Sequence, residues 1–81
     1  YARDVGVIAD KSGLMVVAGG SAGFHPRVAD VIAKELTEEE ALQLVDNIFE
    51  YYKAEAELGE KLSLMIERIG VESFIERVKL R

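Results

Sequence analysis

Residues 19–23 read Gly-Gly-Ser-Ala-Gly and stand between an apolar run and Pro26. A glycine-rich loop between a strand and a helix can offer backbone N–H groups to an anion, as phosphate-binding loops do. The segment lacks the Lys-Ser/Thr pair of a P-loop, and its glycines do not fit the Gly-x-Gly-x-x-Gly pattern. A tight turn, or a close approach of the backbone to a bulky group, is the structural alternative. We expect a positive φ at Gly20, at Gly23 or at both, because turns of this composition use that conformation.

Two basic side chains, His25 and Arg27, flank Pro26. Arg27 is the better candidate for an anionic group, because a guanidinium binds carboxylates and phosphates bidentately, although it could equally pair with Asp30 or Asp4. The chain has one histidine and no cysteine, so His25 has no metal interpretation. The candidate cofactor-binding residues are Gly19, Gly20, Ser21, Gly23 and Arg27, and no residue is assigned to catalysis or to a metal.

The composition bounds the class of protein. The 81 residues make at most one small domain, so we treat 1–81 as a single domain or a domain fragment. Apolar residues make up 49% of the chain, but no apolar run approaches the ~20 residues of a membrane span. Fifteen acidic residues against ten basic ones give a net charge of −5, which argues against nucleic acid or an anionic membrane as partner. We expect a cytoplasmic piece of a longer protein, since the chain starts at Tyr1 and no secretion leader is visible.

Two β-branched runs, residues 4–9 and 14–18, predict a β-hairpin. The turn between them, residues 10–13, ends in Gly13, which can take the positive φ that such a turn requires. The second run has no polar alternation, so both of its faces should be covered, as in a central strand. Because an isolated hairpin is marginal in water, we expect these strands to belong to a larger mixed sheet in the parent protein.

Helical patterns fill the rest of the chain. A short helix is predicted from Pro26 to about residue 36, and a long one begins at Thr37, where Glu40 completes a capping box. Gly59 should end or kink the long helix, and Gly70 should end the helix that follows. The fold class is therefore α+β, a β-hairpin followed by three to four amphipathic α-helices. In the long helix the expected apolar stripe is Leu42, Val45, Ile48, Phe49, Tyr52 and Ala56, and Asn47 is expected on the polar side. In the next two helices the expected apolar residues are Leu62, Met65, Ile66 and Ile69, and Val71, Phe74, Ile75 and Val78.

Five stretches, in this order, carry a resemblance to a known family. They are Asp-Val-Gly-Val-Ile-Ala at 4–9, Met-Val-Val-Ala-Gly-Gly-x-x-Gly at 15–23, Pro-Arg-Val-Ala-Asp at 26–30, Leu-Thr-Glu-Glu-Glu at 36–40, and Ile-Glu-Arg-Ile-Gly-Val-Glu-Ser-Phe at 66–74. Together they resemble the C-terminal part of the nitrite and sulfite reductase 4Fe-4S domain. The family often has Gly-Gly-Asn-Gly-Gly where this chain has Gly-Gly-Ser-Ala-Gly, so no role of an asparagine amide carries over.

The resemblance implies a parent oxidoreductase that moves electrons to sulfite or nitrite. In the family a Cys-x5-Cys and Cys-x3-Cys set holds a 4Fe-4S cluster bridged to siroheme, a haem-type cofactor. The resemblance places these cysteines before Tyr1, so this segment binds neither cofactor alone. It would be an inactive structural part of the cofactor-binding domain, with the remainder of the parent reductase as its partner and an unspecified electron donor.

Two other classes stay open on the residues alone. A small protein-interaction module would use the apolar helix stripes to recruit a partner. An anion or nucleotide binder would use the loop 19–23. A reductase fragment differs from a complete module in one respect, because it should leave apolar strand edges or faces uncovered.

Overall fold

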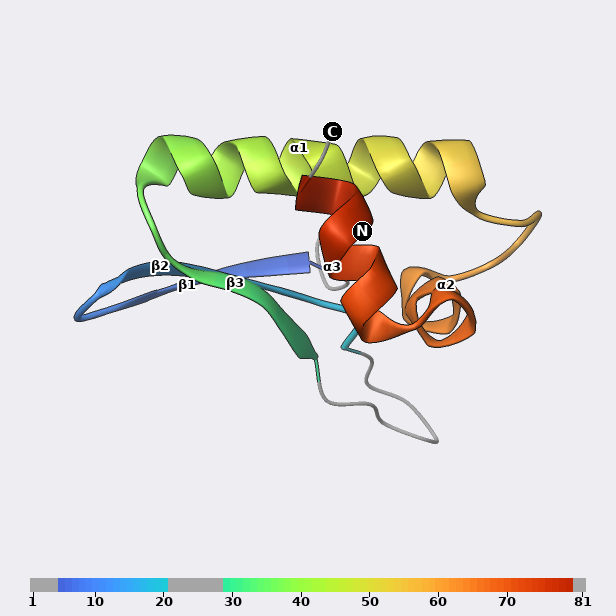
Figure 1. The fold of residues 1–81 in the computed structure, drawn as a ribbon, viewed down its shortest axis with the longest axis horizontal. Coiled ribbons are helices and arrows are strands. Elements are labelled where there is room, and N and C mark those ends of the chain that lie inside the picture. Colours follow the sequence, from blue (N-terminus) through green and yellow to red (C-terminus); the bar gives the residue numbers. More distant parts are fainter. Residues whose placement is uncertain (1–4, 21–28, 80–81) are drawn as a thin grey trace.

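The computed structural model describes residues 5–20 and 29–79, which form a three-stranded sheet followed by three helices (Figure 1). The strands are β1 (Val5–Asp10), β2 (Gly13–Ala18) and β3 (Asp30–Leu36), and the helices are α1 (Glu38–Glu55), α2 (Leu62–Ile69) and α3 (Val71–Lys79). The sheet is antiparallel in the order β1-β2-β3. The predicted α+β class is therefore confirmed.

The predicted hairpin is confirmed, with β1 paired to β2 from Val5 opposite Ala18 to Asp10 opposite Gly13. Gly13 has a φ of 141°. The Asp10 carboxylate accepts hydrogen bonds from the Ser12 N–H and the Ser12 hydroxyl, both at 2.8 Å. These bonds favour the charged carboxylate and lower the pKa of Asp10. The turn is thus held by local polar contacts that its own residues supply.

The helix predicted up to residue 36 is wrong for residues 30–36, which form the strand β3. Its start at Pro26 lies outside the described residues. Val31 and Ile32 are β-branched and favour a strand. The side of β2 that does not pair with β1 carries backbone N–H and C=O groups, and a neighbouring strand supplies their hydrogen-bond partners. Val31 pairs with Val17 on that side, so β2 becomes the central strand, as expected. Two irregularities of register interrupt this pairing, and Glu35 beside one of them has a φ of 59°.

The predicted start of α1 is confirmed in detail. The Thr37 hydroxyl accepts the Glu40 N–H at 3.1 Å, and the Glu40 carboxylate accepts the Thr37 N–H at 2.9 Å. This is the reciprocal capping box that the Thr-Glu-Glu-Glu segment predicted. It fixes the point where the chain leaves the sheet and turns back over it.

The buried face of α1 differs from the predicted stripe. Ile48 is buried as expected, and Val45, Phe49, Tyr52 and Ala56 pack partly against the core, but Leu42 is 60% exposed. The buried positions are Ala41, Leu44, Asn47, Ile48 and Tyr51. The buried face is rotated from the predicted stripe because α3 packs beside α1. The rings of Tyr51 and Phe74 meet edge to face with their centroids 5.8 Å apart, and the Asn47 amide donates to the Val78 carbonyl at 3.0 Å.

The two C-terminal helices follow the prediction. Gly70 ends α2 with a φ of 98°, and its N–H donates to the Ile66 carbonyl at 2.7 Å. Gly59, with a φ of 76°, lies in the turn after α1, which ends at Glu55. One core joins the helices to a single face of the sheet, and its largest fully buried side chains are Phe74, Ile48, Met65, Ile66, Val16 and Val78. In the described part of the chain, no helix is both long and apolar enough to span a membrane.

Candidate functional site

The glycine loop leaves the sheet at the end of β2 and returns at the start of β3. Ala18 and Asp30 are paired across the two strands, so both ends of the loop are anchored at one place on the sheet. Gly19 is buried and has a φ of 85°, a conformation that favours glycine. The loop thus turns sharply as soon as it leaves the central strand.

Gly20 lies where a side chain would be crowded, which is a constraint other than the one predicted. Its φ is not in the left-handed region, whereas that of its neighbour Gly19 is, and the positive φ expected at Gly23 stays a prediction because Gly23 lies outside the described residues. A Cβ on Gly20 would lie 3.0 Å from the Cβ of Ala29, a tighter contact than most Cβ atoms make, so Ala29 would have to shift. The two ends of the loop therefore approach each other closely, and a larger side chain at Gly20 would push them apart.

The other candidate residues lie between these anchored ends. Ser21, Gly23, His25 and Arg27 fall outside the described residues, so their predicted roles stay predictions. Among the residues that are described, no group of acidic or histidine side chains could hold a metal ion. A 4Fe-4S cluster needs thiolate ligands, and the 81 residues include no cysteine. These residues therefore offer no thiolate to such a cluster, and no chemical step is assigned to them.

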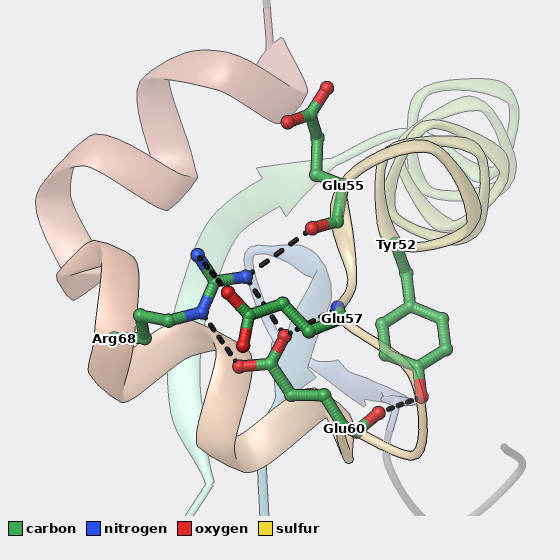
Figure 2. Close-up of polar contacts among 5 residues, drawn as sticks. All are labelled: Tyr52, Glu55, Glu57, Glu60 and Arg68. Atoms are coloured by element: carbon green, nitrogen blue, oxygen red, sulfur yellow. Dashed lines mark hydrogen bonds and ion pairs between the residues drawn. The ribbon is translucent and has the colours of Figure 1, made fainter.

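A second polar cluster, which the sequence patterns did not reveal, joins the end of α1 to α2 (Figure 2). Arg68 of α2 donates from Nε and Nη2 to the two carboxylate oxygens of Glu60, each at 2.8 Å. Its Nη2 also donates to the Glu55 carbonyl at 3.3 Å, and Glu57 lies within ion-pair distance at 3.9 Å. The Tyr52 hydroxyl donates to the Glu60 carbonyl. This arrangement ties the turn between the two helices to both of them.

The electrostatics of this cluster follow from the bidentate pair. The two hydrogen bonds from Arg68, with one from the Glu57 N–H, lower the pKa of Glu60 to about 2. The Glu60 carboxylate in turn raises the pKa of Arg68 above its usual range. Both groups stay charged at neutral pH and satisfy each other, so the cluster fits a structural clamp better than a proton-transfer site. The pair is separated by eight residues, a spacing with no helical or strand signature, which explains why it was missed.

Comparison with known proteins identifies the class of the chain. The family model of the nitrite and sulphite reductase 4Fe-4S domain matches residues 1–81. The chain belongs to this family, as the resemblance predicted. No solved structure matches the chain significantly.

The relatives that the chain resembles are reductases. It is 36% identical over 78 residues to the assimilatory-type sulfite reductase of Nitratidesulfovibrio vulgaris, a match that covers 96% of this chain and 36% of the relative. It is 33% identical over 69 residues to the NAD(P)H nitrite reductase of Bacillus subtilis, covering 85% of this chain and 9% of that enzyme. It is 28% identical over 78 residues to the large subunit of the Klebsiella oxytoca NAD(P)H nitrite reductase, a match that covers 94% of this chain and 8% of that enzyme. The chain thus spans about a third or less of the relatives it matches.

Proposed function

We propose that this chain is the C-terminal portion of the cofactor-binding domain of a sulfite or nitrite reductase that uses siroheme and a 4Fe-4S cluster. The observation that carries the proposal is the family match over residues 1–81, since it covers both the sheet and the helices. The two relatives above 30% identity, a sulfite and a nitrite reductase, support the reaction class. The choice between the two substrates is left to experiment.

In this proposal the chain acts as a scaffold, and the cluster ligands come from elsewhere in the polypeptide. The 81 residues have no thiolate to offer, whereas 4Fe-4S clusters are held by cysteine thiolates. The loop 19–29 is the part of this scaffold that we place toward the cofactors. Its two ends are anchored at Ala18 and Asp30, and residues 19–23 and Arg27 lie along it.

Arg27 is the candidate for contact with an anionic group, either a siroheme carboxylate or the substrate anion. A guanidinium stays charged at all working pH values and binds carboxylates through two parallel hydrogen bonds. The neighbouring Gly19, Gly20, Ser21 and Gly23 would let the backbone approach a bulky cofactor. When bound, the cluster and siroheme would pass electrons from an electron donor to the substrate anion.

The proposal is tested on the complete polypeptide that carries this chain, purified without oxygen. We expect iron and siroheme absorption in the unmodified protein. Arg27→Ala should lower the siroheme content or raise the KM for sulfite or nitrite about tenfold, the effect of losing about 1.4 kcal/mol of binding. Lys11→Ala is the matched control, since it removes one positive charge from the hairpin turn at the opposite end of β2.

Three results would count against the proposal or against one of its parts. A complete polypeptide without pairs of cysteines, or one purified without iron and siroheme, would contradict the redox function. Equal behaviour of Arg27→Ala and Lys11→Ala would remove Arg27 from the cofactor contacts.

A further inference from the structure

The face of the sheet that points away from α1 is apolar. Residues paired across an antiparallel sheet share a face, so the pairs Ile8 with Met15 and Val17 with Val31 identify this side. We call Gly6, Ile8, Met15, Val17 and Val31 the open sheet face. The core that joins sheet and helices includes none of these five residues. Figure 1 shows α1 running along the other side of the sheet.

Two large apolar side chains of the open sheet face are exposed, and Met15 and Val17 between them are partly buried. Ile8 is 46% exposed and Val31 47%, and they stand on the outer strands on either side of β2. Val17 lies between Gly6 and Val31, and a Cβ on Gly6 would come within 3.3 Å of its Cγ2. The face is therefore an apolar surface over three strands, and apolar patches of a few hundred Å² are often functional.

A second copy of the chain is a poor occupant for this face. Strands of about six residues, ~3.3 Å per residue and ~4.8 Å apart, make a face of about 20 by 14 Å, or roughly 300 Å². Two such faces would bury roughly 600 Å² together, about half of the ~1,200 Å² at the lower end of stable interfaces. Each copy also carries a net charge of −5, which opposes the association.

We propose that the open sheet face docks on an apolar surface of the same reductase polypeptide, formed by residues outside these 81. This inference rests on the proposed function, because it takes the chain as part of a longer reductase. The sulfite reductase relative has 64% of its length outside the match, since the chain covers 36% of it. A surface too small to hold a separate molecule can hold a tethered one, because the second contact is intramolecular and its effective concentration is high.

The two methionines of the chain supply a native test. Met15 lies on the open sheet face, whereas Met65 is fully buried in the core. The complete polypeptide is exposed to hydroxyl radicals in solution, and side-chain oxidation is read by mass spectrometry. We expect Met15 to be protected to within about threefold of Met65, because oxidation follows exposure. Leu42, 60% exposed on α1, is the exposed control and should be labelled freely.

Three outcomes would overturn the inference. Met15 labelled at least about tenfold faster than Met65 would show that the face is open in the complete polypeptide. Protection that appears only at high protein concentration would assign the face to a second copy. Protection that appears only after an electron-donor protein is added would assign it to that partner.

A pair of charge variants adds a second readout. Val31→Lys places a charge on the open sheet face, and Leu42→Lys places the same charge on the exposed side of α1. In the complete polypeptide we expect Val31→Lys to lose most of its soluble yield and Leu42→Lys to keep it, because a buried unpaired charge is costly. Equal yields of the two variants would overturn the docking.

Iron and siroheme absorption measured on the same sample separates this inference from the proposed function. If Met15 is readily oxidised in a protein that holds both cofactors, the docking is wrong and the proposed function stands. If Met15 is protected in a protein without the cofactors, the docking on the rest of the polypeptide stands and the redox function is wrong.

Discussion

Asn47 is the residue whose replacement tests the packing of α1 against α3 most directly. Its side chain is 9% exposed, and its amide donates to the Val78 carbonyl at 3.0 Å. Its amide oxygen accepts a hydrogen bond from Gln43 Nε2 at 3.0 Å. Asn47→Ala removes the donor and leaves the carbonyl at the end of α3 without this partner.

The expected cost follows from that unpaired group. Leaving one buried donor or acceptor unsatisfied costs about 1–3 kcal/mol, so we expect the free energy of unfolding to fall by about 2 kcal/mol. An 81-residue domain has roughly 4–12 kcal/mol of stability in total, at ~0.05–0.15 kcal/mol per residue. The melting temperature should fall by roughly 8–16 °C, at about 4–8 °C per kcal/mol for a domain of this size.

The assay is urea unfolding of the 81-residue chain followed by circular dichroism, with two further variants. Asp46→Ala is the control, since Asp46 is exposed on the same helix and its replacement should cost less than about 0.5 kcal/mol. Asn47→Asp introduces a buried carboxyl whose charged form cannot donate to the Val78 carbonyl. Burial raises its folded pKa above the unfolded value of about 3.9. The penalty of this variant should therefore be full above the folded pKa and should shrink as the pH falls toward the unfolded value.

Two results would refute this reasoning. A loss below about 0.5 kcal/mol in Asn47→Ala, with an unchanged slope on urea, would show that the contact to α3 contributes nothing net. An Asn47→Asp penalty that stays constant across acidic pH would show that the introduced carboxyl is not buried.

Three further predictions concern the clamp, the helix cap and the loop. The pKa of Glu60 is lowered from 4.5 to about 2 by Arg68, so the stability that this pair contributes is present above pH 4.5 and lost as the pH falls toward 2. The difference between the unfolding midpoints of the unmodified chain and Glu60→Gln should shrink across that window, and a constant difference would contradict the pairing. Thr37→Ala should cost about 1 kcal/mol by loss of the cap, and an unshifted urea midpoint would show that the cap is dispensable. Gly20→Ala should cost about 1–3 kcal/mol by crowding Ala29, and the double variant with Ala29→Gly should recover most of it. Additive losses in thermal melting would rule out that clash.

The family and most element boundaries could be predicted from the sequence because their determinants are local. Gly13 and Gly70 mark the hairpin turn and the end of α2, and both adopt positive φ as such positions require. The Thr37 and Glu40 pair caps α1 with residues only three apart. The family resemblance depends on residue order alone, and the family match over the whole chain confirms it.

The tertiary structure decided the features that depend on partners distant in sequence. Residues 30–36 carry an apolar pattern compatible with a helix, but the free edge of β2 needs hydrogen-bond partners and makes them a strand. The buried face of α1 turned toward α3 because Asn47 meets Val78, 31 residues away. Arg68 binds Glu60 across the turn between α1 and α2. A side chain on Gly20 would crowd Ala29, which lies beside it in the fold. The local sequence pattern indicates which backbone conformations are favourable, whereas only the folded structure determines which side chains distant in sequence contact one another.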